Sequence, residues 1–312
     1  MSFSAVIATS ASPSRRARLL EIVRHIGQYD LLEELIVIWQ SSESPGLEFQ
    51  HPKLRIFKCH ARAVSLARNL GAFKATGKWL WFLDDDTIPA SPSYLETAKF
   101  ALEGSRSGRS LDFVTSNVSG PGVGQVCQRI NVDTPIDNKT LWGNFWEPGL
   151  IVARHVFLEV NYDIFLGPGC LHGSSEGSDL GMRMLRAGHI GTRIHDLDLD
   201  HPRIERSHDY RNKLFIYALG NGLVAMRYGG IKRLLLNVIK CSIKVGIALV
   251  MLRFSDAVDQ FVRLCGLVVG PCLQPSPPLN LEPSWLSSKN ILEEFDSLSR
   301  TASAQSDQHS KT

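Results

Sequence analysis

Three consecutive carboxylates, Asp84, Asp85 and Asp86, directly follow the apolar run WLWFL at 79–83. Adjacent carboxylates repel one another, so a folded protein keeps them where water, basic groups or a cation relieves the repulsion. Alternate carboxylates that hold Mg²⁺ or Mn²⁺ can bind and neutralise a diphosphate. A solvated turn, or a cap for a helix beyond Pro89, is the other interpretation of the triplet. Both interpretations stay open on these residues alone.

Apolar runs along the first hundred residues predict the elements that position the triplet. The expected strands span 3–9, 35–39, 54–57 and 79–83, and the expected helices span 15–26 and 63–75. Strands that alternate with helices favour a mainly parallel, doubly wound α/β sheet. Ligands bind at the carboxyl ends of the strands in such a sheet, and the triplet falls at one of these ends.

The second hundred residues are less regular. The pattern predicts helices over 94–102 and 178–187 and strands over 111–118, 149–153 and 196–200. The strict alternation DLDLD at 196–200 ends at His201 and Pro202, because proline cannot donate a hydrogen bond to a sheet.

Two blocks of motifs resemble the family 2 glycosyltransferases, which have the GT-A nucleotide-diphospho-sugar transferase fold. The first block contains ARNLG at 67–71, ATG at 75–77 and FLDDD at 82–86. The second contains YD at 162–163, FLGPG at 165–169, GSSEGSDL at 173–180, Arg183, RAG at 186–188 and HP at 201–202. The ordered set covers roughly residues 3–202 and is far more specific than any single motif. The resemblance implies a GT-A fold, with a mainly parallel mixed sheet flanked by helices.

The resemblance also implies a metal site. Asp84 and Asp86 match the DxD acids, which in the family hold the donor's ribose and the divalent cation, Mn²⁺ or Mg²⁺, that bridges its diphosphate. Asp85 is the variable middle residue of the donor-binding triplet. His201 matches a histidine that could approach the metal, since a neutral imidazole is a competent ligand. The other interpretation of His201 is the end of an edge strand.

Donor contacts follow from the same resemblance. Thr9 and Ser10 lie where the family contacts the nucleotide, and Arg68 lies in its donor-contacting helix. The family commonly has an aspartate after its second strand to hold the base of the nucleotide, and this chain has Gln40 there. Gln40 can form hydrogen bonds, but the selectivity for the base is not fixed by it.

The acceptor base departs from the family pattern. The family's Glu-Asp pair, whose aspartate usually takes the proton of the acceptor hydroxyl, is Glu176-Gly177 here. Glu176 is the nearest remaining candidate, although a helix N-terminus would lower its pKa and weaken it as a base. Asp179 is the second candidate, but a salt bridge with Arg183 one turn later is the role that we favour for it. Gly177 also leaves open a protein of this fold that has lost transfer activity.

The segment 210–255 has eight Lys or Arg and no Asp or Glu, although the whole chain has a net charge of only +3. Arg233, Asn237, Lys240 and Lys244 form one polar stripe on an otherwise apolar helix. The segment either packs on the transferase core with this stripe solvated, or lies in the interface of an anionic membrane, which we favour. Nucleic-acid binding is disfavoured, because stacking aromatic residues are sparse.

These patterns divide the chain into a GT-A domain at 1–205, a basic amphipathic helical region at 206–270 and a loosely ordered Pro/Ser-rich tail at 271–312, with one amphipathic turn near 291–298. The six cysteines form no CxxC pair and are expected to be buried thiols in a reducing compartment. The longest apolar run, at 245–252, is well below the roughly 18 residues of a membrane span.

The resulting hypothesis is a bacterial-type glycosyltransferase in the cytoplasm, at the inner face of the plasma membrane. It would move a sugar from a nucleotide-diphosphate donor, expected to be a UDP-sugar, to a hydroxyl of a glycan or lipid-linked saccharide, with inversion. The alternative is a membrane-attached protein of the same fold that binds a nucleotide or glycan without catalysis.

Overall fold

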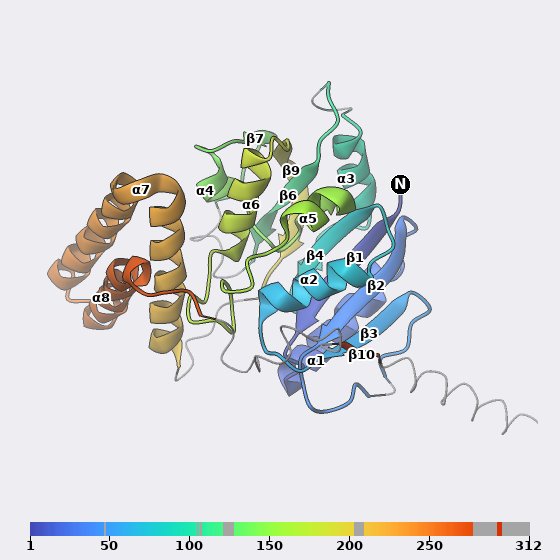
Figure 1. Cartoon of the computed structure of the whole chain (residues 1–312), viewed down its shortest axis with the longest axis horizontal. Coiled ribbons are helices and arrows are strands. Elements are labelled where there is room, and N and C mark those ends of the chain that lie inside the picture. The colour runs from blue at the N-terminus through green and yellow to red at the C-terminus, as the bar shows by residue number, and fades with distance from the viewer. Residues whose placement is uncertain are drawn as a thin grey trace, which may run out of the picture.

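A computed structural model of the chain describes residues 1–46, 48–104, 106, 108–120, 128–202 and 209–276, together with the backbone of 292–294. A single mixed β-sheet forms its centre (Figure 1). The strands are β1 (Phe3–Thr9), β2 (Leu32–Trp39), β3 (Leu54–Cys59), β4 (Trp79–Asp84), β5 (Ile88–Pro89), β6 (Phe113–Ser119), β7 (Thr134–Ile136), β8 (Ile151–Ala153), β9 (Gly191–Asp200) and β10 (Leu292–Glu294).

The order of the strands is β10-β3-β2-β1-β4-β8-β6-β9-β5, and β7 also pairs with β9. The strands β3, β2, β1 and β4 are parallel, as their buried runs predict. The short strand β8 is antiparallel to both β4 and β6, whereas β6 and β9 are parallel. The prediction of a mainly parallel mixed sheet is therefore confirmed.

Helices cover both faces of the sheet (Figure 1). They are α1 (Pro13–Ile26), α2 (Val64–Lys74), α3 (Tyr94–Leu102), α4 (Leu141–Asn144), α5 (Arg154–Val160) and α6 (Glu176–Arg186). Successive side chains of β1 point to opposite faces: Ile7 packs in the core with α1 and α3, and Val6 packs in the core with α2, α5 and α6. This two-layered core fixes the carboxyl ends of the strands, where the candidate site lies.

A helical region follows the sheet, as predicted. It contains α7 (Tyr210–Val250), α8 (Phe254–Val269) and the 3₁₀ helix η1 (Gly270–Cys272). The helix α7 is kinked at Gly230, whose φ of 61° lies outside the helical region. The part of α7 after the kink and α8 pack on each other and project away from the sheet (Figure 1). Among the described residues, no helix is both long enough and apolar enough to cross a membrane.

The polar stripe predicted on this region is solvated only in part: Lys240 and Lys244 are exposed, whereas Arg233 and Asn237 are partly buried. The Arg233 guanidinium lies 4.5 Å from the ring centroid of Trp142 and so packs on the core. Asn237, Lys240 and Lys244 instead line a groove that α7 forms with α8. The long aliphatic side chains of α7 therefore point outward.

Two smaller expectations are wrong. The amphipathic turn predicted near 291–298 is replaced at 292–294 by β10, which pairs antiparallel with β3, and the remaining residues of this prediction lie outside the described part. The expectation of buried thiols holds for Cys59, Cys170 and Cys241, but Cys272 is exposed and Cys265 is partly exposed. Cys127 lies outside the described residues.

Candidate active site

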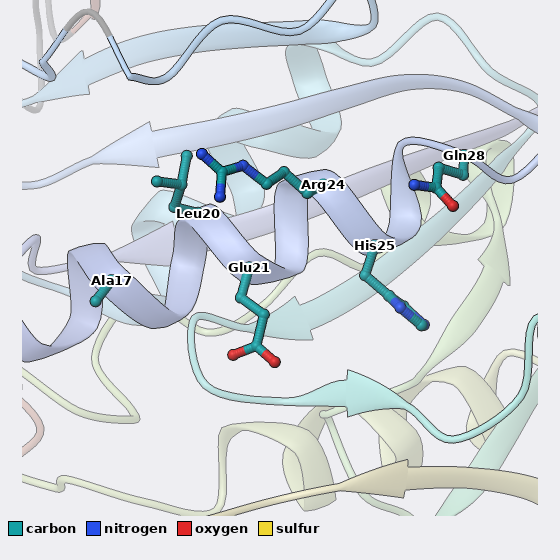
Figure 2. Close-up of a pocket in the computed structure, with 6 residues that line it drawn as sticks. All are labelled: Ala17, Leu20, Glu21, Arg24, His25 and Gln28. Atoms are coloured by element: carbon teal, nitrogen blue, oxygen red, sulfur yellow. The ribbon is translucent and has the colours of Figure 1, made fainter.

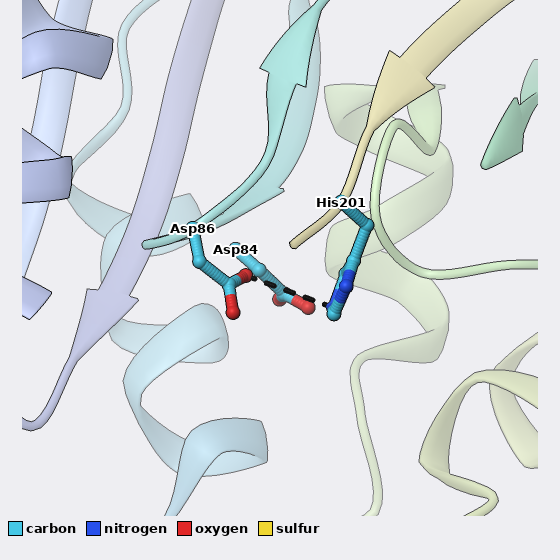
Figure 3. Close-up of side chains that lie close together, drawn as sticks. All are labelled: Asp84, Asp86 and His201. Carbon is cyan, nitrogen blue, oxygen red and sulfur yellow. Dashed lines mark ion pairs between the residues drawn. The ribbon is translucent and has the colours of Figure 1, made fainter. Parts of the chain in front are cut away.

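Two acidic side chains and one histidine converge at the carboxyl end of β4 (Figure 3). Asp84 ends β4, Asp86 follows two residues later, and His201 follows the last residue of β9. The short strand β5 brings these segments together, because it pairs antiparallel with the end of β9, Ile88 opposite Asp200. One ligand atom from each of the three residues lies within 4.8 Å of the others, and His201 Nε2 is 3.8 Å from Asp86 Oδ1.

The hydrogen bond of His201 sets its tautomer. His201 Nδ1 lies 2.7 Å from the carbonyl oxygen of Pro202. A carbonyl oxygen can only accept, so Nδ1 carries the proton and the lone pair of Nε2 faces the acids. Two carboxylates and one imidazole nitrogen form a donor set that fits a divalent cation such as Mn²⁺.

The middle carboxylate, Asp85, is held by Thr9 and by Arg15, which also pairs with Asp86. Thr9 donates a hydrogen bond to Asp85 Oδ2 at 2.6 Å, and Arg15 Nη1 donates to Asp85 Oδ1 at 3.0 Å. Burial raises the pKa of the Asp85 carboxyl to about 6. Asp85 and the predicted nucleotide contact Thr9 are thus joined to each other inside the protein. Ser10, the other predicted contact, is exposed at the end of β1.

Gln40, in the position that the family uses for the base of the nucleotide, is buried. Its Nε2 donates to the carbonyl oxygens of Ala61 and Ala63 at 2.7 and 3.1 Å. The amide nitrogen therefore holds the segment that leads into α2.

Arg68 connects Asp84 to Glu176, the predicted acceptor base. Its Nη2 lies 2.6 Å from Asp84 Oδ1, and its Nη1 lies 3.4 Å from Glu176 Oε1. Its guanidinium also lies 5.4 Å from the ring centroid of Tyr162. The side chain of Arg68 is only 3% exposed, so α2 presents a buried positive charge between the two carboxylates.

The electrostatic surroundings of Glu176 differ from the expectation. The sequence predicts that the N-terminus of α6 lowers the pKa of Glu176, but burial and the negative charge of Glu147 raise it, against the opposing effect of Arg68. The prediction is wrong because the effect of a helix end is smaller than the desolvation of a carboxylate that is 7% exposed.

Glu147 is a further carboxylate beside Glu176, and the sequence does not predict it. It lies in the segment between α4 and β8, and its Oε1 accepts a hydrogen bond from the backbone N–H of Gly177 at 2.7 Å. No motif marks Glu147, since it lies between Trp146 and Pro148 in an irregular segment. Burial also raises the pKa of Glu147.

Asp179, the second predicted base, is fully buried and held by three side chains. Its Oδ2 pairs with Arg183 at 2.7 Å, which confirms the predicted salt bridge. Its Oδ1 accepts hydrogen bonds from Arg227 and from the Tyr228 hydroxyl, both at 2.7 Å. These contacts tie α6 to α7 and correspond to the structural role.

A separate pocket of about 320 Å³ lies along α1, and none of these acids lines it (Figure 2). It is lined by Ala17, Leu20, Glu21, Arg24, His25 and Gln28. No second element contributes a side chain to it, so it has no converging groups that could perform chemistry.

The mixed sheet with helices on both faces is the GT-A fold, and the acids lie at the end of β4 in it. Residues 5–116 match the family described as glycosyl transferase family 2. No curated protein sequence matches the chain.

Three solved structures illustrate the shared fold. TarS residues 1–349 from S. aureus, in complex with UDP-GlcNAc, is 14% identical with a TM-score of 0.50, over 70% of this chain and 66% of that chain. The mannosyltransferase PcManGT from Pyrobaculum calidifontis, in complex with GDP-Man and Mn²⁺, is 12% identical with a TM-score of 0.58, over 86% of each chain. GalNAc-T7 with UDP, GalNAc and Mn²⁺ is 15% identical with a TM-score of 0.50, over 72% of this chain and 48% of that chain. This chain thus spans about two thirds of the TarS fragment. At these sequence identities, the similarity to the three structures shows a shared fold only.

Proposed function

We propose that the protein transfers a sugar from a nucleotide-diphosphate donor, a UDP-sugar in the first instance, to a hydroxyl of a glycan or a lipid-linked saccharide. The convergence of Asp84, Asp86 and His201 beside the Arg68–Glu176 pair carries this proposal. It is supported by structures of this fold that contain UDP-GlcNAc, or GDP-Man and Mn²⁺. The residues that would hold a Mn²⁺ or Mg²⁺ ion are Asp84, Asp86 and His201.

A bound cation would neutralise charge on the leaving diphosphate. The residues of the chain have two tasks. Arg68 keeps the Asp84 carboxylate in place through a charge-assisted hydrogen bond of 2.6 Å. The carboxylates at the amino end of α6, Glu176 among them, are the groups positioned to take the proton of the acceptor hydroxyl. Direct attack by that hydroxyl inverts the anomeric centre.

Donor turnover tests this proposal. UDP-glucose, UDP-galactose, UDP-GlcNAc and GDP-mannose are incubated with the protein and Mn²⁺, and release of the nucleoside diphosphate is measured. We expect Asp86→Asn and Glu176→Gln to reduce the rate at least about 100-fold. Asp196→Asn is the control, because Asp196 belongs to a second acidic cluster in which it pairs with Arg106 at 2.5 Å. Undiminished rates in both site variants would remove the assignment.

The rival function, binding without catalysis, makes a different prediction. Calorimetry would then show tight binding of UDP in the presence of Mn²⁺, while all four donors stay intact. The Gly177 position and the buried state of Glu176 are the features that favour the rival.

We also propose that α7 and α8 attach the protein to an anionic membrane, where a lipid-linked acceptor would reside. Large apolar side chains are exposed along both helices. They include Ile231, Leu235, Leu236, Ile239, Ile243, Ile247, Val258 and Phe261. Lys240, Lys244 and Arg263 line the groove beside this apolar surface. Apolar side chains next to basic groups are the combination that binds an anionic lipid interface.

Cosedimentation with vesicles tests the attachment. We expect binding to phosphatidylglycerol/phosphatidylcholine vesicles that weakens with salt, and little binding to phosphatidylcholine alone. Ile239→Glu with Ile243→Glu should abolish binding, whereas Phe73→Glu is a matched control because Phe73 is 69% exposed on α2. Equal binding by both variants, or dimerisation without vesicle binding, would contradict the proposal.

A further inference from the structure

The space for a side chain at position 177 is already filled by another carboxylate. A Cβ atom built on Gly177 would lie 2.1 Å from Glu147 Oε1, 2.2 Å from Glu147 Cδ and 2.3 Å from Glu147 Cγ. The family that this chain resembles has an aspartate at this position. The Glu147 carboxyl group, 30 residues earlier in the chain, therefore occupies the place where that aspartate side chain would begin.

The backbone around Glu147 fixes this carboxylate relative to the metal-binding acids. The N–H of Gly149 donates to the carbonyl oxygen of Phe82 in β4 at 2.8 Å, and the N–H of Leu150 donates to the carbonyl oxygen of Glu147 at 3.1 Å. The strand β4 ends at Asp84. The segment with Glu147 is thus attached to the same strand that positions the acids, and its Oε1 is held by the N–H of Gly177.

Glu147 and Glu176 differ in their access to a substrate. Glu176 is buried and is paired with Arg68, whereas Glu147 is partly exposed. Among the described residues, no basic side chain forms an ion pair with Glu147, although the charge of Arg68 opposes the rise of its pKa; its carboxylate accepts a hydrogen bond from the backbone N–H of Gly177. A base must reach the acceptor hydroxyl within hydrogen-bond distance, so the partly exposed carboxylate is the better placed of the two.

We propose that Glu147 is the acceptor base, in place of the carboxylate that the family carries at position 177; this inference rests on the proposed transferase function. The Glu147 carboxylate accepts the proton of the acceptor hydroxyl as its oxygen bonds to the anomeric carbon. The bond between that carbon and the diphosphate oxygen breaks at the same time, and the nucleoside diphosphate leaves with the electron pair. Glu176, held by Arg68, then acts as a positioning residue.

The raised pKa of Glu147 supports this role, because a more basic carboxylate is a better proton acceptor. The competing explanation is purely structural: Glu147 caps α6, whose N-cap residue Ser175 makes no capping hydrogen bond through its own side chain. A substitution that removes the negative charge of Glu147 but keeps its hydrogen bond with Gly177 distinguishes the two explanations.

Glu147→Gln makes this separation, since an amide oxygen can still accept the N–H of Gly177. In the donor assay with n-octyl β-glucoside or water as acceptor, we expect kcat to fall at least about 100-fold. The affinity for UDP with Mn²⁺ and the Tm should stay close to those of the parent protein. Glu147→Ala combined with Gly177→Asp moves the carboxylate to the family position, and we expect it to recover at least about tenfold over Glu147→Ala alone.

The outcomes are distinguishable. An active parent protein with an equally active Glu147→Gln variant overturns this inference and leaves the proposed function intact. A Glu147→Gln variant that loses UDP affinity and thermal stability together with its activity also overturns it, in favour of the capping role. A parent protein that binds UDP with Mn²⁺ but turns over none of the four donors overturns the proposed function, and the role of Glu147 with it.

Discussion

Arg68 Nη2 donates a hydrogen bond to Asp84 Oδ1 at 2.6 Å, so the helix α2 holds the carboxylate that ends the strand β4. The same guanidinium reaches Glu176 at the start of α6. The buried guanidinium of Arg68 therefore connects the proposed metal site to the proposed acceptor site. This relationship joins an arginine of the ARN motif to an acid of the FLDDD motif, 16 residues apart in the chain.

Removal of the Arg68 guanidinium should lower the stability of the fold. Arg68→Met leaves Asp84 and the buried Glu176 without their common partner, so we expect the free energy of unfolding to fall by about 3 kcal/mol at pH 8. Urea denaturation followed by circular dichroism measures the change. Arg24→Met on the exposed surface of α1 is the control and should change stability by less than about 0.5 kcal/mol. Equal effects of the two substitutions would contradict the importance of the buried pair.

The metal site should depend on His201. His201→Ala removes the nitrogen that faces Asp86 at 3.8 Å, and we expect the affinity for Mn²⁺, measured by calorimetry in the presence of UDP, to fall at least about tenfold. Removal of divalent cations with EDTA should abolish UDP binding in the parent protein. His155→Ala is a matched control, because His155 is exposed on α5. An unchanged Mn²⁺ affinity in His201→Ala would exclude the histidine as a ligand.

The sequence could predict the parts of the site that follow from local pattern. The strand that ends at Asp84 is visible as a hydrophobic run, and the strand that ends before His201 is visible as the alternation DLDLD. The parallel sheet places their ends at one edge. Glu147 could not be predicted, because its hydrogen bond to Gly177 joins segments that no motif connects. The pKa of Glu176 was predicted in the wrong direction, since a helix end is a local feature whereas burial and a second carboxylate are tertiary ones.

The pH dependence of the stability should reveal the raised pKa of Glu176. Above the ordinary pKa of a glutamate, the unfolded chain releases the Glu176 proton while the folded protein retains it, so folding is progressively weakened as pH rises. Glu176→Gln removes this effect. We expect the Tm of the variant to equal that of the parent near pH 4 and to exceed it increasingly toward pH 8, by differential scanning fluorimetry.

Glu34 provides the control of opposite sign. Burial tends to raise the pKa of Glu34, but hydrogen bonds from Thr76, Ser4 and Arg55 lower it overall. Its ionised form therefore stabilises the fold above its unfolded pKa, and this contribution disappears as pH falls. Glu34→Gln should lower the Tm at pH 7, and the difference should close in acid. If both variants changed with pH in the same direction, the assignment for Glu176 would be wrong.

The helix α2 packs closely on the strand β1, and a substitution at Gly71 can test this contact. A Cβ atom on Gly71 would lie 2.4 Å from Val6 Cγ1, so Gly71→Ala must push the helix away from the strand. Overpacking of this kind costs about 1–3 kcal/mol, which urea denaturation would detect.

The same displacement should also affect the site, because Arg68 lies one turn earlier on α2 and would move relative to Asp84. We therefore expect Gly71→Ala to weaken binding of UDP with Mn²⁺, and Val6→Ala in the same chain to restore part of both stability and binding by making room. Gly143→Ala is the control, since no atom lies within 4 Å of a Cβ built there. If Gly71→Ala loses stability but binds UDP as the parent protein does, the position of Arg68 is set by its ion pairs rather than by the packing of α2 on β1.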